Sequence, residues 1–281
     1  MKYAIHAPNF STYSDPRALS DLAREAEDAG WDGFFLWDHY FWKRPEPQPV
    51  ADTWTLLTAI AARTEKITIG PLITPLPRRR PWTVARQAAT LDHFSGGRLV
   101  LGVGIGGDWF GDYSAFGETM GDKEHGEMLD EALAIISGLW SGKEFSFEGK
   151  HYQVKDALFI PKPLQQPRIP IWVAGNWPNK KPFRRAAMWD GVAAEARSDL
   201  GTLAPQHFRD IAVYVKENRS GARPFEMTHI GRTPGNNPEA AVDIVSPYAD
   251  AGVTWWLERI GDQQDTLEEM RSRVQEGPPI G

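Results

Sequence analysis

The stretch "SGGRLVLGVGIGG" (residues 95–107) ends in a glycine pattern that has two opposing interpretations. From Gly102 to Gly107 it matches the spacing G-x-G-x-x-G, which opens the dinucleotide-binding turn of a Rossmann fold. That turn follows the first strand of its domain and leads directly into a helix. An acidic residue lies about 20 positions further on, at the end of the next strand. The surrounding sequence decides whether these conditions hold here.

Three strand–helix units precede the glycines. Strands are predicted over 2–7, 33–37 and 66–74, and helices over 16–29, 52–64 and 81–94. The apolar run 98–103 is then a fourth strand, and the irregular stretch 104–124 separates it from the next helical pattern, 125–140. A fourth strand with no helix directly behind it argues against a Rossmann turn. The glycines instead end a barrel strand and let backbone approach a flat ligand, or they form a glycine-rich turn without a ligand.

The same alternation continues to the end of the chain. Further strands are predicted over 169–175, 190–195, 225–231 and 254–260, with helices over 180–189, 205–219, 236–252 and 265–275. Eight apolar strands, each followed by a helix, favour an α/β fold of the (β/α)8 TIM-barrel type, and a doubly wound open sheet is the alternative. We expect a single domain over residues 1–281, with an insertion at about 104–124 and a hairpin at about 145–168.

Composition excludes several kinds of site. The 281 residues include no cysteine, so disulfides, thiolate nucleophiles and cysteine-ligated metals are excluded. The net charge is −6 and no basic stripe is present, so no nucleic-acid partner is expected. No apolar run reaches about 18 residues and no secretory signal is seen, which predicts a cytoplasmic protein without a membrane partner. No metal-binding histidine pair, phosphate-loop lysine or serine nucleophile motif occurs, and no metal is expected.

Several motifs together resemble the bacterial-luciferase-like monooxygenase family. They are "PLPRRRPWTVARQAATLDHFSGGRLVLGVGIGG" (75–107), "DYSAFG" (112–117), "LWDHY" (36–40), "PKPLQQPRIPIWVAG" (161–175), "AAMWDGV" (186–192) and "YADAGVT" (248–254). The resemblance covers essentially the whole chain. It implies a TIM barrel that binds FMN, or the deazaflavin coenzyme F420, at the carboxyl ends of the strands. It also implies redox chemistry on a small organic substrate, often in a homodimer.

The resemblance also implies site residues. His39 ends the second strand, where a histidine faces the reactive centre of the flavin and can donate a proton, whereas Asp38 is expected to orient its neighbours. A backbone bulge, often with a non-proline cis peptide, supports the flavin at the end of the third strand. The expected cofactor-binding residues are Leu72, Ile73, Thr74, Ile105, Gly106, Ala174, Gly175, Asn176 and Trp177. Backbone N–H groups near Gly175 and Asn176, with Lys180, Lys181 and Arg184 close by, could hold a phosphate.

Substrate contacts are predicted from residue type and position at the rim. Trp42, Trp109 and Tyr113 lie in rim loops and could form pocket walls. Glu195 and Glu258 end the sixth and eighth strands, where each is either a polar pocket group or part of a salt bridge. One departure from the family matters. F420-dependent sugar-phosphate dehydrogenases carry a glutamate just after the glycine pair, where this chain has Gly107 followed by Asp108. This argues against membership of that subgroup without excluding F420 as the cofactor.

The first hypothesis is a monooxygenase that uses reduced FMN, supplied by a separate flavin reductase or by nicotinamide, and O2. The second is an F420-dependent hydride-transfer oxidoreductase, and the third is a non-catalytic flavin-binding protein. A barrel lyase or aldolase would need a Schiff-base lysine or a metal cluster at a strand end, and the sequence offers neither.

Overall fold

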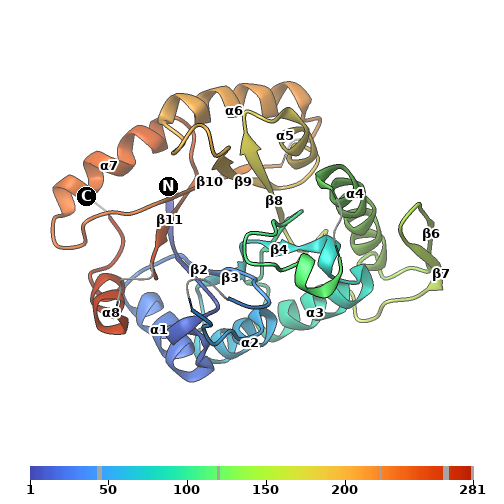
Figure 1. Cartoon of the computed structure of the whole chain (residues 1–281), viewed down its shortest axis with the longest axis horizontal. Coiled ribbons are helices and arrows are strands. Elements are labelled where there is room, and N and C mark those ends of the chain that lie inside the picture. The colour runs from blue at the N-terminus through green and yellow to red at the C-terminus, as the bar shows by residue number, and fades with distance from the viewer. Residues whose placement is uncertain (43–45, 119–120, 222, 262–265, 280–281) are drawn as a thin grey trace.

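A parallel sheet forms the centre of the molecule (Figure 1). The computed structural model describes residues 1–42, 46–118, 121–221, 223–261 and 266–279. The strand order in this sheet is β3-β2-β1-β11-β10-β9-β8-β5-β4. The strands are β1 (Lys2–Ala7), β2 (Gly33–Leu36), β3 (Thr68–Pro71), β4 (Thr74–Pro75), β5 (Leu101–Gly104), β8 (Ile171–Trp177), β9 (Gly191–Ala196), β10 (Glu226–Gly231) and β11 (Trp255–Arg259).

The sheet closes on itself through an interrupted strand. β3 pairs with β2, β4 pairs with β5, and the two pieces are separated only by Leu72 and Ile73. A parallel bridge between Ile69 and Leu99 joins the start of β3 to the chain that leads into β5. β3 and β4 thus act as one barrel strand, which makes eight strands in the ring. The predicted TIM barrel is confirmed, and the open doubly wound sheet is wrong because an open sheet has two free edges.

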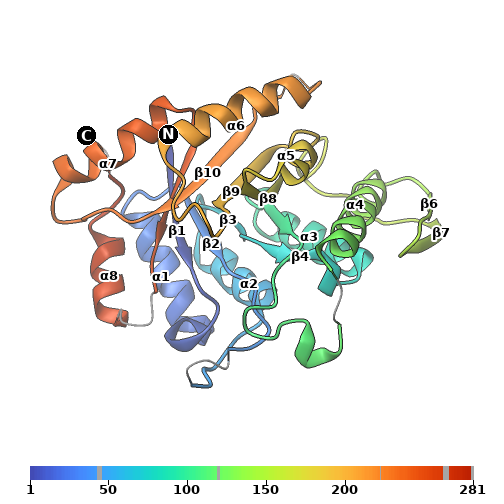
Figure 2. The same ribbon diagram turned by 45° about the horizontal axis from the view of Figure 1, so that its top comes forward.

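Eight helices surround the barrel in the described part of the chain (Figures 1 and 2). They are α1 (Pro16–Asp28), α2 (Thr53–Arg63), α3 (Pro81–Phe94), α4 (Asp122–Leu139), α5 (Lys180–Ala186), α6 (Pro205–Asn218), α7 (Pro238–Asp250) and α8 (Leu267–Gln275). Local signals in the sequence begin several of them. Asp15, for example, accepts hydrogen bonds from the N–H groups of Arg17 and Ala18 at the start of α1, with Pro16 in the first helical position.

One hairpin lies outside the barrel. Strands β6 (Phe145–Glu148) and β7 (Gln153–Ala157) pair in antiparallel fashion and project beside α4 (Figure 1). The segment between β5 and α4 contains only one short 3-10 turn, Ser114–Phe116, in its described residues. Among the described residues, no helix is long and apolar enough to cross a membrane.

Side chains that point into the barrel alternate along each strand and form two layers. Phe35, Trp172 and Trp255 belong to one buried cluster and pack with ring centroids 5.3–5.8 Å apart. Two and four residues further along the same strands, the inward positions hold Trp37 and His39 after Phe35, and Leu257 and Arg259 after Trp255. On β8, Trp172 is likewise followed by Ala174 and then Asn176, because successive side chains in a strand point to opposite faces. The lower layer therefore fills the barrel and forms a floor beneath its carboxyl end.

Replacing Gly33 with alanine should destabilise this lower layer. A Cβ at Gly33 would lie 2.8 Å from the ring of Trp255 and 2.9 Å from the Cβ of Ala4. Because overpacking a well-packed core costs about 1–3 kcal/mol, the free energy of unfolding should fall by that amount in a denaturant titration. Gly121→Ala is the matched control, since a Cβ there would meet nothing within 4 Å. An equal loss in both variants would contradict this account of the core.

Candidate functional site

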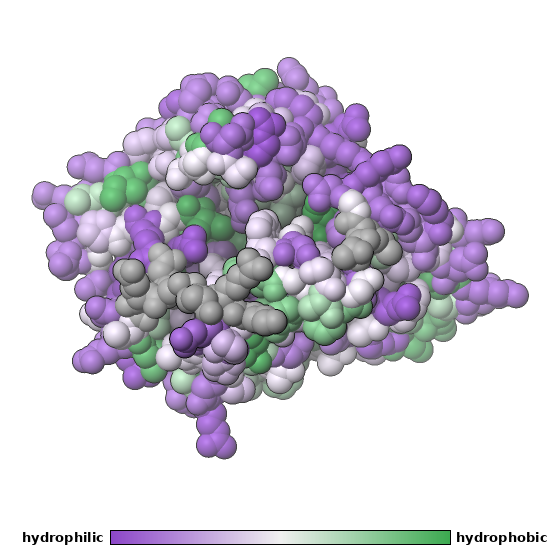
Figure 3. Space-filling model, viewed as in Figure 1, coloured by the Kyte–Doolittle hydropathy of each residue, from purple (hydrophilic) through white to green (hydrophobic). Residues whose placement is uncertain are grey.

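A cavity of about 830 Å3 lies at the carboxyl ends of the barrel strands, which is the catalytic end of TIM barrels. Figure 3 shows the molecule hollowed near the centre of this face, with hydrophobic and hydrophilic side chains around the hollow. The barrel strands and the turns that follow them contribute lining residues, among them His6, His39, Leu72, Ile73, Gly106, Ala174, Asn176, Glu195, Ile230 and Arg259.

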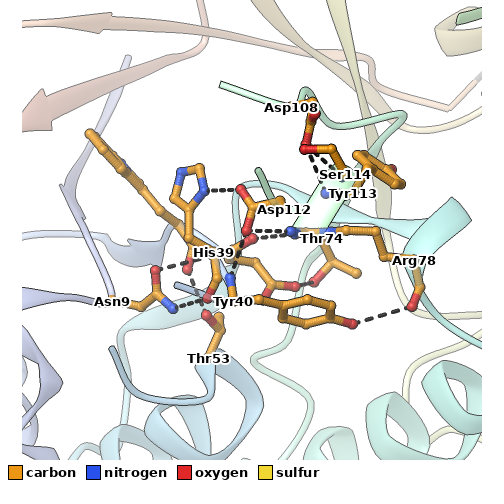
Figure 4. Close-up of polar contacts among 12 residues, drawn as sticks. Asn9, His39, Tyr40, Thr53, Thr74, Arg78, Asp108, Asp112, Tyr113 and Ser114 are labelled. Carbon is orange, nitrogen blue, oxygen red and sulfur yellow. Dashed lines mark hydrogen bonds and ion pairs between the residues drawn. The ribbon is translucent and has the colours of Figure 1, made fainter. Parts of the chain in front are cut away.

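His39 is held from one side by a buried carboxylate (Figure 4). Its Nδ1 lies 2.7 Å from Oδ2 of Asp112, a side chain 73 residues away on the loop after β5. The side chain of Asp112 is 1% exposed and that of His39 is 16% exposed. The carboxylate accepts the Nδ1 proton, so in the neutral ring the lone pair is on Nε2. Within the described chain Nε2 has no hydrogen-bond partner, which leaves it able to accept or donate a proton.

The Asp112 carboxylate is fixed by two further groups. Its Oδ1 accepts a hydrogen bond of 2.9 Å from the N–H of Tyr40 and lies 2.8 Å from the guanidinium of Arg78. Burial raises the pKa of Asp112, but the bonds from His39 and Tyr40 and the charge of Arg78 outweigh this, and the pKa lies below its usual value. The carboxylate therefore stays ionised at neutral pH.

Asp38 holds the surrounding chain in place and has no free position for a reactant. Its carboxylate accepts a 2.7 Å bond from the hydroxyl of Thr74 and pairs with the guanidinium of Arg79 at 2.7–3.1 Å. Its backbone carbonyl accepts a bond from Arg78. The sequence-based view of Asp38 as an orienting residue agrees with this geometry.

The wall next to His39 contains a cis peptide between Leu72 and Ile73, as the resemblance implied for this position. The Leu72 carbonyl lies 3.0 Å from Nε2 of His6, and the indole N–H of Trp37 donates to Nδ1 of the same ring at 3.2 Å. Burial lowers the pKa of His6 to about 4, so the ring is neutral near pH 7. Because Nδ1 accepts from Trp37, the single proton is on Nε2 and is donated to the Leu72 carbonyl.

Gly106 and Gly107 make the adjacent wall, and each has a reason to lack a side chain. Gly106 has φ +71°, and a Cβ there would lie 2.8 Å from Pro75. A Cβ at Gly107 would lie 2.6 Å from the ring of Trp109, so this ring lies over the glycine. Asp108 points elsewhere: its carboxylate accepts bonds from the N–H groups of Tyr113 and Ser114 (Figure 4).

Most of the predicted site residues line the cavity. These are His39, Leu72, Ile73, Ile105, Gly106, Trp109, Ala174, Gly175, Asn176 and Glu195. The structure therefore brings together, in one cavity, residues from the second to the sixth barrel strands that the sequence could only place at strand ends.

Four predicted residues are not among those that line this cavity, namely Thr74, Trp42, Tyr113 and Trp177. The hydroxyl of Thr74 is bonded to Asp38, and Trp42 lies behind the cavity, with ring centroids 4.1 Å from Phe10 and 3.8 Å from Phe110. Tyr113 donates its hydroxyl to the Ile105 carbonyl and stacks on His125. Trp177 packs on the outer side of the barrel against Phe183 and Tyr214. In each case burial within the protein removes the side chain from the cavity surface.

Sequence reasoning missed His6, Asp112 and Arg259 as site residues. The side chain of Arg259 lies over the Trp37 ring, 5.2 Å from its centroid, and both residues line the cavity. The signal for His6 and Arg259 was present in the strand period, since they follow the inward-facing Ala4 and Leu257 by two positions. No local signal connects Asp112 to His39.

Lysine and amide side chains gather at one end of the cavity. Asn176, Asn179, Lys181 and Lys123 line it there, between β8, α5 and α4. Of the three cations predicted near a phosphate, only Lys181 is part of this lining. Lys180 lies 3.6 Å above the ring of Trp177, and Arg184 lines a separate groove between α4 and α5. In the part of the chain that the structure describes, no group of three or more acidic or histidine side chains could hold a metal ion.

Known proteins resemble this chain in sequence. The family model of luciferase-like monooxygenases matches residues 1–272. An F420-dependent glucose-6-phosphate dehydrogenase of Microbacterium testaceum is 37% identical over 166 residues, or 58% of this chain and 48% of that protein. One from Kineococcus radiotolerans is 35% identical over 167 residues, with the same coverage. The chain thus matches about half the length of these curated relatives.

Several solved structures share this fold at low sequence identity. At such identity the likeness supports the fold and says nothing of function. An F420-dependent secondary alcohol dehydrogenase superposes with a TM-score of 0.82 at 18% identity, covering 99% of this chain and 98% of that one. The oxygenating constituent of 3,6-diketocamphane monooxygenase from Pseudomonas putida superposes with a TM-score of 0.78 at 15% identity, covering 98% and 96%. On the match of the family model to nearly its whole length, this chain belongs to the luciferase-like monooxygenase family of oxidoreductases.

Proposed function

We propose that this chain is an F420-dependent oxidoreductase that transfers a hydride between the deazaflavin and the hydroxyl-bearing carbon of an organic substrate. This reverses the order of preference drawn from the sequence, where an FMN-dependent monooxygenase came first. Two considerations support the change. The curated relatives cited above are named as F420-dependent dehydrogenases, and the pairing of His39 with Asp112 suits proton removal from an alcohol.

The cavity fits a deazaflavin in size and lining. Its volume of about 830 Å3 is within the 300–1,000 Å3 typical of ligand sites. Leu72, Ile73, Gly106 and Ala174 line it without charged groups, as a flat ring requires. Lys181 and Asn176, at the polar end, could hold a phosphate.

His39 carries the chemistry that the protein itself supplies. A deazaflavin held by the residues named above would supply the hydride acceptor or donor. The Nε2 of His39 takes the hydroxyl proton as the alcohol becomes a carbonyl, and it returns that proton in the reverse direction. Asp112 keeps Nε2 in the required tautomer and stabilises the ring while it is charged. The observation that carries the proposal is this buried carboxylate on Nδ1, with Nε2 open at the cavity.

Cofactor preference tests the proposal directly. A ligand that binds only the folded state stabilises it by about 2.7 kcal/mol when present at 100 times its Kd. We therefore expect F420 to raise Tm by several degrees and FMN to leave it nearly unchanged. Under anaerobic conditions, F420 should be reduced when secondary alcohols are added. Stabilisation by FMN alone, with O2 consumed during turnover, would contradict the proposal.

A flavin monooxygenase is the second candidate, and the aromatic rings near His39 favour it. The ring of Phe110 lies 5.1 Å from that of His39 and 3.8 Å from that of Trp42, and Trp109 lies at the cavity mouth. Such rings exclude water, and oxygen chemistry on a reduced flavin needs a site from which water is excluded. Substrate oxygenation by the FMN-loaded protein would favour this candidate.

A further inference from the structure

The two sides of the cavity differ in chemistry. On the side formed by β3, β4, β5 and β8, the proposed ring-binding wall consists of Leu72, Ile73, Gly106 and Ala174. On the opposite side, β9, β10 and β11 present Glu195, Ile230 and Arg259 to the cavity. Sheet order separates β9 from β2 by β10, β11 and β1, so Glu195 and His39 lie on opposite sides of the barrel mouth. A substrate that spans the barrel mouth from His39 would therefore meet the wall that contains Glu195.

Glu195 differs from the carboxylates near His39. The carboxylate of Asp38 already binds an arginine and a threonine hydroxyl. The carboxylate of Asp112 already binds an arginine, the His39 ring and a backbone N–H group. Glu195 has neither a hydrogen bond nor an ion pair within the described residues, and its side chain is exposed to the cavity. Burial inside the barrel mouth, which withdraws the carboxyl group from bulk water, raises the pKa of Glu195, and the charge of Arg259 partly offsets that effect. Its acceptor oxygens are thus available to a ligand.

We propose that Glu195 selects the substrate: its carboxylate accepts a hydrogen bond from a neutral, hydroxyl-bearing molecule and keeps phosphorylated molecules out. This proposal rests on the proposed function and gives its substrate class. Opposite charges on Glu195 and Arg259 leave the wall without the net positive charge that a phosphate dianion needs. Specificity of this kind comes from repulsion of the wrong ligand as well as attraction of the right one. The chain should accordingly differ from its relatives that are named for a phosphorylated sugar.

Charge variants of Glu195 test the proposal. We would measure binding of cyclohexanol, other neutral secondary alcohols and glucose 6-phosphate by calorimetry, with and without F420. In Glu195→Gln, alcohol affinity should fall about tenfold or more, because hydrogen bonds to a charged group are stronger than neutral ones. In Glu195→Lys, glucose 6-phosphate should bind at least tenfold more tightly than in the wild type, because the repelling charge becomes an attracting one. Glu217→Gln, at an exposed position on α6, is the matched control and should change neither affinity.

Several results would overturn this role for Glu195. They are unchanged alcohol affinity in Glu195→Gln, wild-type binding of glucose 6-phosphate as tight as in Glu195→Lys, or no wild-type binding of any alcohol. If Glu195→Lys does not fold, Glu195→Gln alone decides, because it keeps the shape of the side chain. F420 affinity is measured separately in every variant. If the wild type does not bind F420, the proposed function is refuted. The alcohol and glucose 6-phosphate titrations without cofactor would still measure the effect of Glu195 on ligand affinity.

Discussion

Replacing Asp112 with asparagine is expected to lower kcat by about 100-fold or more, since positioned acid–base catalysis contributes roughly 10²–10⁴. Asparagine keeps the shape of the side chain but can present its N–H2 group to Nδ1 of His39. The ring proton would then move to Nε2, where it blocks proton removal from an alcohol. Cofactor affinity should change little, because Asp112 acts through His39. The measurement is a steady-state assay beside a cofactor titration.

Asp108→Asn is the matched control on the same loop. Asp108 is exposed, accepts bonds from the N–H groups of Tyr113 and Ser114, and does not line the cavity. Asparagine can accept the same bonds, so kcat should remain within about threefold of the wild type, the range expected of a surface change away from the site. Equal losses of kcat in the two variants would show that loop folding, rather than the contact with His39, controls activity.

For Asp112→Asn we also expect a pH-dependent difference in stability from the wild type. The folded-state pKa of Asp112 is lowered, so the ionised carboxylate contributes stability above its unfolded pKa, and this contribution is lost as pH falls through the folded pKa. The wild type should therefore exceed Asp112→Asn in stability at neutral pH, and the difference should shrink in acid. Denaturant titrations at neutral pH and near pH 3 measure it. A difference that grows in acid would contradict the direction given for this pKa.

Helix and strand patterns predicted the barrel because each of its elements carries a local signal. Apolar strands, helix caps such as Asp15 and the delayed helix after Gly107 were all visible in the sequence. The orientation of single side chains was the harder step. Glu195 and Glu258 both end strands and could not be told apart without register. In the structure Glu195 faces the cavity, whereas Glu258 is 1% exposed and accepts bonds from Thr233 and Trp256.

Aromatic residues in rim loops were the least predictable part of the site. A tryptophan gains free energy by burying its apolar ring against either protein or ligand, so composition alone does not distinguish the two. Trp177 directly follows the inward-facing Asn176 and therefore points to the opposite face of β8. The contact between Asp112 and His39 joins residues 73 positions apart. Such a contact depends on the path of a loop, which no periodic pattern encodes.

Replacing Trp172 with alanine is expected to cost about 3–5 kcal/mol of the free energy of unfolding, the range for removing a large aromatic side chain from a core. Trp172 is 2% exposed and lies between Phe35 and Trp255 inside the barrel. A Cβ at Gly191 would lie 2.6 Å from its ring, so a glycine on the neighbouring strand leaves the space that the indole fills. Alanine would leave a void that the closed barrel cannot collapse to fill.

Trp109→Ala is the control that separates this packing from aromatic content. Trp109 is 67% exposed at the cavity mouth, so its loss should change the free energy of unfolding by no more than about 0.5 kcal/mol, as for most surface substitutions. Parallel denaturant titrations of the two variants would measure the contrast.

Because Trp172 lies two residues before Ala174 on the inward face of β8, its removal should also weaken cofactor binding through the wall above it. If Trp172→Ala lost stability but bound cofactor as tightly as the wild type, the lower layer would fill the barrel without supporting the site.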